Sequence, residues 1–525
     1  MARATIVITG AATLCLQLIA SRVMTPFFGV SLLIWTGILS VTLLCLALGY
    51  FYGGVFCRGR SAQSLRAAYY LSPALSGLWL VAAVLLYPVC LGPLASLSLV
   101  GGAFLASLLI LAVPLILLSA LNPLLVALER PQHGEADAGA GWVFFISTMG
   151  SVAGVLVAAF AMIPHLSGRH SILVIAGTLS LLAALGGRRG PVLVLGLAGL
   201  VAALVLGVAD PAGRDGRMVR DGADRPWITL AAYPSAFGVL KVVDVGQGDG
   251  SWRMLLNDGL AQNGFDAQGR SALQFTHFLE AGAVHLVPRP RKVLVLGLGA
   301  GVIPAAFEAR GARVEVVEIN HRAFEAARDH FGYRPGPATT LVFADARTQV
   351  RGCSGHYDLV FVDLFSGDGM PEHLMTREFF TDVHSCLAEG GVVAINSFLD
   401  AEHAEPNRAM LATLVRVFGR VAFVEQAHPP SRPITNAFLF AARRPGDLNR
   451  LAEMAVEASG APPAMAAQMR ESLRSLQLVD AASALVAGAG VLTDEDNPLA
   501  ALAAPAQMTF RRRAVATIPD PILVD

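Results

Sequence analysis

The first 209 residues carry almost no charge, and this limits the possible folds more than any other feature of the chain. They contain nine arginines, no lysine and three acids, whereas the remaining 316 residues hold the other 66 charged side chains. A soluble domain usually has about 25% charged residues. The first part is therefore predicted to lie in lipid and the second in water. Because the net charge of the whole chain is zero, we expect no nucleic acid partner.

Seven apolar runs in the first part are candidates for membrane helices, each of which needs about 20 apolar residues. They lie near residues 4–20, 30–54, 71–92, 100–127, 141–163, 171–187 and 191–209. The run at 4–20 is taken as a first helix and not as a cleaved signal sequence, because it lacks a clear small-residue cleavage site and further runs follow. The fourth run contains Pro114 and Pro123, which favour a kink or a break.

The arginines give conflicting indications of the side of the membrane on which the second part of the chain lies. Three arginines in the 55–70 loop and two at 188–189 predict cytoplasmic loops. With seven spans the second part would then lie outside, but four arginines at 214–225 attract the segment after the last run to the cytoplasm. A count that differs by one span would reconcile the two. We expect a multi-pass protein of the cell (inner) membrane, with its second part in the cytoplasm.

Few polar residues interrupt the apolar runs; Gln17, Asn122, Ser147 and Thr148 are the visible ones. An ionisable group deep in a span would indicate transport, and none is present, so an anchor or scaffold is favoured over a transporter or lipid pocket. The cysteines and histidines show neither a Cys-x-x-Cys pair nor a metal-ligand spacing. We therefore expect no disulfide scaffold and no metal site.

The second part is predicted to contain a linker at 210–229, an α/β domain at 230–445 and a C-terminal helical tail at 446–525. Runs at 239–245 and 252–257, joined by a glycine-rich turn, predict a β-hairpin. From residue 292 onward the order is strand, glycine turn, helix and strand, with further strands at 341–344, 357–363 and 391–396. This order predicts an open, mostly parallel, doubly wound sheet. The arginine run at 511–513 is expected to be solvated.

Acidic residues end three successive strands of this predicted sheet, and a glycine turn follows the first strand. Gly297, Gly299 and Gly301 allow a ligand to approach the backbone, and Glu318 can accept the hydroxyl groups of a ribose. Asp345 and Asp363 end the next two strands and face the same crevice. Each acid alone could merely cap a helix or a turn. The turn is too tight for the dinucleotide motif and no basic cluster follows, so the ligand is predicted to be a nucleoside without phosphates, such as S-adenosylmethionine or a relative.

Residues 230–445 resemble the spermidine synthase (polyamine aminopropyltransferase) family, of the membrane-fused bacterial type. The matching pieces are residues 257–262 (NDGLAQ), 293–301, 317–319, 345–346, 357–363 (YDLVFVD), 371–380 and 390–391. Residues 47–49 and 493–498 (TDEDNP) also resemble segments of the fused proteins. The implied fold class is a multi-span α-helical membrane domain fused to an α/β methyltransferase-like Rossmann domain with a small N-terminal β-hairpin region.

The resemblance also implies a reaction and its residues. An aminopropyl group of decarboxylated S-adenosylmethionine would move to putrescine or a related amine, releasing methylthioadenosine, with no permanently bound cofactor. Asp363 matches the catalytic acid, which accepts the proton of the attacking amine. The nucleoside would be held by Gly297, Gly299, Gly301, Glu318, Asp345 and Ala346, and the amine by Gln262, Asp363 and Ser366. The histidines His277 and His373 are left out of the catalytic set, because a lone loop histidine is usually solvated.

Two departures from the family pattern keep other functions open. The family usually has acids where this chain has Ala300 and Ser366. A dication needs carboxylates to replace its hydration, so the acceptor side is altered. The alternatives are an S-adenosylmethionine-dependent transferase, such as a methyltransferase, acting on another and membrane-associated acceptor, or a non-catalytic nucleoside-binding membrane protein. The expected partners are a small amine and the lipid bilayer, and a homo-oligomer is compatible with the sequence.

Overall fold

A computed structural model describes residues 1–30, 32–129, 136–187, 190–209, 216, 218–365, 367, 369–400, 402–427 and 434–524. The chain forms two compact units. The first comprises Met1–Ala223, Pro234–Val239 and Arg511–Asp525, and the second comprises Asp224–Tyr233 and Leu240–Phe510. Each unit is described by itself below.

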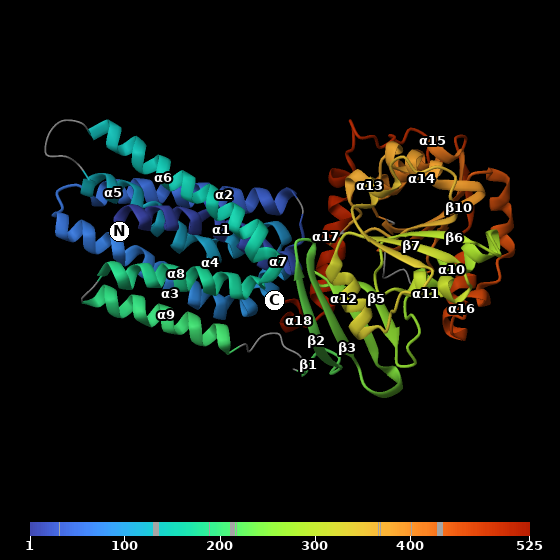
Figure 1. The fold of residues 1–525 in the computed structure, drawn as a ribbon, viewed down its shortest axis with the longest axis horizontal. Helices are drawn as coiled ribbons and strands as arrows, with labels where there is room; N and C mark the ends of the chain where they lie inside the picture. Colours follow the sequence, from blue (N-terminus) through green and yellow to red (C-terminus); the bar gives the residue numbers. More distant parts are fainter. Residues whose placement is uncertain are drawn as a thin grey trace. The chain divides into compact units, whose positions relative to one another are not determined.

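The first unit is a bundle of long apolar helices (Figure 1). Its helices are α1 (Ala2–Phe28), α2 (Leu32–Phe56), α3 (Ala62–Leu97), α4 (Leu99–Ser119), α5 (Leu121–Glu129), α6 (Ala136–Val157), α7 (Ile163–His165), α8 (Gly168–Gly187) and α9 (Pro191–Val208). Within the described residues, seven segments are long and apolar enough to cross a membrane, and Leu99–Glu129 counts as one of them. The expected break in the fourth run is thus a short interruption between α4 and α5.

Small residues let helices of this bundle approach closely. A Cβ at Gly150 of α6 would lie 2.1 Å from the carbonyl oxygen of Val7, and one at Gly154 would lie 2.1 Å from that of Ala11. These glycines are four residues apart, as expected where two helix backbones touch in an apolar medium. Arg511 belongs to this unit, is 1% exposed and donates to the carbonyl oxygen of Pro26 at 2.9 Å. The expectation of a solvated arginine run is therefore wrong at Arg511.

An antiparallel five-stranded sheet precedes the α/β domain, in the order β1-β2-β3-β4-β5. The strands are β1 (Met218–Arg220), β2 (Pro226–Ser235), β3 (Gly238–Val245), β4 (Trp252–Asn257) and β5 (Leu260–Asp266). The expected hairpin is the β3–β4 pair, in which Leu240 lies opposite Asn257. The sheet extends this hairpin on both sides.

The second sheet has eight strands in the order β13-β11-β12-β10-β9-β6-β7-β8. They are β6 (Lys292–Leu296), β7 (Arg313–Glu318), β8 (Thr339–Phe343), β9 (Tyr357–Val362), β10 (Leu387–Asp400), β11 (Arg420–Glu425), β12 (Ile434–Ala442) and β13 (Gln477–Asp480). Strands β8, β7, β6, β9 and β10 pair in parallel, and the other three pair antiparallel. The predicted methyltransferase-like Rossmann fold is confirmed. Since β6 has β7 on one side and β9 on the other, a crevice is expected at its carboxyl end.

Helices cover both faces of this sheet (Figure 1). The helices of the domain are α10 (Gln274–Leu286), α11 (Val302–Ala309), α12 (His321–His330), α13 (Ala346–Val350), α14 (Arg377–Cys386), α15 (Glu405–Phe418), α16 (Pro463–Leu473) and α17 (Leu499–Thr517), with α18 (Asp520–Leu523) in the first unit. One core packs α10, α11 and α16 against the sheet, and a second core packs α13, α14 and α15 against the opposite face. Strands buried on both faces explain the continuous apolar runs that predicted them.

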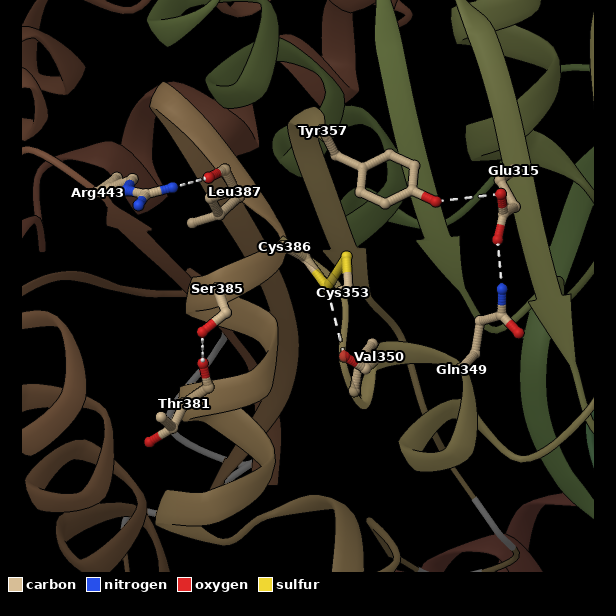
Figure 2. The surroundings of a disulfide bond; sticks show 10 residues. All are labelled: Glu315, Gln349, Val350, Cys353, Tyr357, Thr381, Ser385, Cys386, Leu387 and Arg443. Atoms are coloured by element: carbon tan, nitrogen blue, oxygen red, sulfur yellow. Dashed lines mark hydrogen bonds between the residues drawn. A yellow bond between two sulfur atoms is a disulfide. The ribbon is translucent and has the colours of Figure 1, made fainter. Parts of the chain in front are cut away.

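A disulfide joins Cys353, after α13, to Cys386 at the end of α14 (Figure 2). The Cα atoms are 4.9 Å apart. The expectation that the cysteines form no disulfide scaffold did not foresee this single pair, because the two cysteines are separated by 33 positions in the sequence. Nearby, Glu315 accepts from Gln349 Nε2 at 2.7 Å and from the hydroxyl of Tyr357 at 3.0 Å. Glu315 is thus bonded within the fold.

Candidate functional site

The turn after β6 depends on its three glycines. The φ angles of Gly297, Gly299 and Gly301 are 96°, 54° and 82°. Residues with a side chain rarely adopt such positive angles. A Cβ at Gly297 would lie 2.2 Å from the carbonyl oxygen of Asp363, and one at Gly301 would lie 2.4 Å from the ring of Tyr333. The turn therefore packs directly against the end of β9, which brings the predicted nucleoside side and the predicted catalytic acid together.

Glu318, at the end of β7, is tied to the glycine turn. Its Oε2 accepts from the backbone N–H of Leu298 at 2.9 Å, and its Oε1 accepts from that of Asn320 at 2.7 Å. Burial raises the pKa of Glu318 above its usual value, and the backbone N–H groups oppose the shift. A carboxylate has about four acceptor positions, so the fixed Glu318 can still accept two ribose hydroxyl groups.

Asp345 begins α13, and each of its oxygens has a different partner. Oδ1 accepts from the backbone N–H groups of Arg347 and Thr348 at 2.9 and 3.3 Å. Oδ2 lies 3.1 Å from Nε2 of His373. Burial raises the pKa of Asp345, but the bond from His373 and those from the backbone outweigh it, so the pKa lies below its usual value. Ala346 is the buried first residue of α13.

Asp363 follows β9 at the carboxyl end of the sheet. Its Oδ1 accepts from Nδ2 of Asn396 at 2.9 Å. Burial raises the pKa of Asp363 to about 6; the charge of Glu318 adds to the shift, and the bond from Asn396 opposes it. A carboxylate with a pKa near neutrality is suited to proton transfer.

Asn396 is held in turn by Asn436. The Nδ2 of Asn436, on β12, donates to Oδ1 of Asn396 at 2.8 Å. This bond leaves Asn396 with only its NH₂ group to offer Asp363, and it fixes the direction of the amide. Sequence reasoning missed both asparagines. The signal was present, since an amide in the middle of an apolar strand must find a partner when buried.

Aromatic rings lie close to these residues in the sequence and in the fold. Phe365 stacks on Phe398 with ring centroids 5.6 Å apart, and Phe398 stacks on Phe510 at 6.4 Å. Phe365 follows Asp363 by two residues, and Phe398 follows Asn396 by two residues on the same face of β10. The three stacked rings thus include residues that follow Asp363 and Asn396 by two positions in the sequence.

The other residues that the sequence suggested for the site are not at the strand ends that carry Glu318 and Asp363. Gln262 is half-buried on β5, in the five-stranded sheet. Its neighbour Asn263 has its Nδ2 3.6 Å from the position of a Cβ at Gly299, which brings β5 near the turn. Ser366 lies outside the described residues. Ala300 is 1% exposed and packs in an apolar cluster with residues of β3, β4 and α12, so its methyl group serves packing.

The two histidines differ. His277 is buried, with its Nε2 3.0 Å from the carbonyl oxygen of Ser271, which is a structural role. His373 contacts Asp345, so it belongs to the surroundings of the site. The side chain of His373 is 55% exposed, as expected for a loop histidine, and its ring nitrogen meets the carboxylate of Asp345.

The sheet order and the glycine turn define a Rossmann domain of the methyltransferase-like class. Residues 276–430 match the family model described as the spermine/spermidine synthase domain. This match supports the resemblance of the α/β domain to the spermine/spermidine synthase family.

Individual relatives match part of the chain. It is 34% identical over 116 residues to the polyamine aminopropyltransferase of Vibrio vulnificus, covering 21% of this chain and 39% of the relative. It is 30% identical over 148 residues to putrescine N-methyltransferase 1 of Nicotiana tabacum, covering 26% of this chain and 39% of the relative. The chain thus spans about two fifths of the length of these relatives. The spermidine synthase structure from Thermotoga maritima aligns with a TM-score of 0.36 at 16% identity, over 46% of this chain and 87% of that one.

Proposed function

We propose that this protein is an aminopropyltransferase that moves the aminopropyl group of decarboxylated S-adenosylmethionine to putrescine or a related amine. The observation that carries the proposal is Asp363, whose raised pKa and fixed orientation suit a proton acceptor at the end of β9. Similarity to a polyamine aminopropyltransferase supports it. The nucleoside would lie along the glycine turn, with its ribose on Glu318 and its adenine at Asp345.

The proposed reaction is a single displacement. The lone pair of the amine nitrogen forms a bond to the propyl carbon attached to the sulfonium, and the carbon–sulfur bond breaks with its electrons going to sulfur. Neutral methylthioadenosine leaves and needs no acid. The nitrogen must lose a proton, because an amine is mostly ammonium at pH 7. Since Oδ1 of Asp363 is occupied by Asn396, that proton passes to Oδ2. Alignment of the two reactants supplies much of the acceleration.

The decisive experiment uses purified full-length protein with decarboxylated S-adenosylmethionine and putrescine. Formation of methylthioadenosine and the aminopropylated amine in equal amounts supports the proposal. Asp363→Asn should stop turnover and leave nucleoside binding intact. Wild-type protein that binds ordinary S-adenosylmethionine tightly and yields no methylthioadenosine with any amine would refute it.

A methyltransferase is the second candidate. Its support is the 30% identity to a putrescine N-methyltransferase, together with the packing role of Ala300, where the family usually has an acid. Both reactions displace a thioether from a sulfonium and need the same proton acceptor. The products separate them, because methyl transfer from S-adenosylmethionine releases S-adenosylhomocysteine and not methylthioadenosine.

We further propose that the seven apolar segments cross a lipid bilayer and hold the enzyme at the inner membrane. The support is their length and their small-residue contacts, such as those of Gly150 and Gly154. Fractionation of cells expressing the protein should place it with membranes after washing with high salt and carbonate. Recovery in the soluble fraction would contradict this assignment.

A further inference from the structure

The TDEDNP motif at residues 493–498 has no role in the proposed reaction, yet it is fastened to the segment that follows Asp363. Asn497 Nδ2 donates to the carbonyl oxygen of Glu372 at 2.8 Å. The backbone N–H of Asp494 donates to Oε2 of Glu378 at 3.0 Å. Immediately before the motif, the carbonyl oxygen of Leu492 accepts from the N–H of Arg377 at 2.8 Å. Two bonds from the motif and one from the residue before it therefore fix this segment to residues 372–378.

Arg347 connects the TDEDNP motif to the surroundings of Asp345, the acid expected to bind the nucleoside. Its guanidinium donates to both carboxylate oxygens of Asp494, with an Nη1–Oδ1 distance of 2.8 Å. The same Nη1 donates to the carbonyl oxygen of His373 at 2.7 Å and to Oγ1 of Thr376 at 3.3 Å. The side chain of Arg347 is 13% exposed and that of Asp494 is 42% exposed. The bidentate geometry makes this pair more directional than an ion pair with a single hydrogen bond.

His373 completes a continuous path to Asp345. Arg347 fixes its backbone, and its ring nitrogen lies 3.1 Å from Oδ2 of Asp345. The other oxygen of Asp345 is engaged by backbone N–H groups at the start of α13. The carboxylate is therefore braced on both sides, and Oδ2 keeps one lone pair for an exocyclic amino group.

We propose that Asp494 and Arg347 are positioning residues that hold His373 against Asp345 and so orient this carboxylate toward the amino group of a bound adenine. The inference rests on the proposed function, since it takes Asp345 as the adenine acid. It gives the tail motif a role in selecting the donor nucleoside, at a distance from the reacting atoms.

The test measures binding to full-length protein in detergent by calorimetry. The probes are 5′-methylthioadenosine and 5′-methylthioinosine, which has an oxygen in place of the 6-amino group. Asp494→Asn should weaken methylthioadenosine binding about 3- to 10-fold and leave methylthioinosine binding unchanged. The matched control is Glu495→Gln: Glu495 is the exposed neighbour in the motif, and its side chain makes no hydrogen bond or ion pair within the described part of the chain. This control should match wild type with both probes.

A double-mutant cycle tests the path through Asp345. In an Asp345→Asn background, Asp494→Asn should cause no additional loss of methylthioadenosine affinity. Arg347→Lys keeps the charge but loses the bidentate fork, and it should reproduce the effect of Asp494→Asn. Equal affinities for Asp494→Asn and Glu495→Gln, or an equal loss with both probes, would overturn the inference. Failure of wild type to bind methylthioadenosine would instead refute the proposed function itself.

Discussion

The Nδ2 atom of Asn396 lies 2.9 Å from Oδ1 of Asp363, and Asn436 holds the other end of the same amide. Asp363 thus receives a hydrogen bond that stabilises its charged form within a crevice that disfavours charge. Burial raises the pKa of Asp363 and the bond from Asn396 lowers it. Together they set the pH range in which this carboxyl can accept a proton.

Asn396→Ala should move the acidic limb of the rate profile to higher pH. The bond from Asn396 lowers the pKa of Asp363, so its loss lets the pKa rise above about 6. A hydrogen bond to a charged group contributes about 1.5–3 kcal/mol, and one pKa unit corresponds to about 1.4 kcal/mol, so we expect a shift of about one to two units. Ser397→Ala is the control, because the Ser397 hydroxyl lies against Met410 on the opposite face of β10. An unmoved limb in Asn396→Ala would show that the amide does not tune Asp363.

In the wild-type protein, kcat/KM should rise with pH with a midpoint near 6, where Asp363 loses its proton. Below that pH the protonated carboxyl cannot accept the ammonium proton, so activity falls. Asp363→Asn should lower kcat by about 10²- to 10⁴-fold and leave nucleoside affinity unchanged. Steady-state rates measured from pH 5 to 9 check both statements, and a variant with ordinary turnover would remove the assigned role.

Gly297→Ala should abolish nucleoside binding and destabilise the domain. The new Cβ would meet the carbonyl oxygen of Asp363, which is backbone and cannot move aside. Gly311→Ala is a matched control: its φ is 81° and the space around it is open, so it suffers the conformational cost of about 1–2 kcal/mol without the clash. Thermal unfolding and nucleoside binding of the two variants separate the effects. Comparable behaviour of both would mean that the turn tolerates a side chain.

Reduction of the Cys353–Cys386 disulfide should lower the free energy of unfolding of the α/β domain by about 2–4 kcal/mol, because it closes a loop of 33 residues. Chemical denaturation with and without dithiothreitol measures the change. The Cys353→Ser/Cys386→Ser variant should unfold like the reduced protein and be insensitive to the reductant. Unchanged stability upon reduction would show that the bond contributes nothing.

The same disulfide bears on the side of the membrane. Five apolar segments lie between the loop after α2 and the α/β domain, an odd number, and disulfides persist in oxidising compartments. If these segments cross the membrane, the odd number places the loop and the domain on opposite sides, and the disulfide favours an oxidising compartment for the domain. Both differ from the cytoplasmic placement expected from the arginines of the linker. With the free cysteines Cys15, Cys45, Cys57 and Cys90 replaced by serine, the variants Ser61→Cys and Glu495→Cys should therefore react with a membrane-impermeant maleimide from opposite faces. Labelling of both from the cytoplasmic face would restore the cytoplasmic placement.

The sequence predicts the parts of the site that short stretches determine. Gly297, Glu318, Asp345 and Asp363 each directly follow or end an apolar run, and parallel strands bring such ends to one edge. Asn396 escapes this reasoning because its partners depend on the pairing of β10 with β12, in which Phe398 lies opposite Asn436.

His373 escapes the same reasoning for a different cause. Its contact with Asp345 depends on the irregular course of the chain after β9, and Arg347 reaches Asp494 across 147 residues of sequence. Contacts between residues so far apart leave no periodic pattern in the sequence. The local pattern therefore yields the acids, and the long-range packing yields the groups that orient them.

Residues 511–525 belong to the helical unit, although the α/β domain separates them from it in the sequence. Ile522 and Leu523 are buried there. A simple end-to-end fusion of a membrane protein to an enzyme would leave nothing of the first partner beyond the second. In this chain the enzyme is instead an insertion, flanked on both sides by residues of its host. Removal of residues 511–525 should therefore destabilise the helical unit, although these residues follow the α/β domain in the sequence.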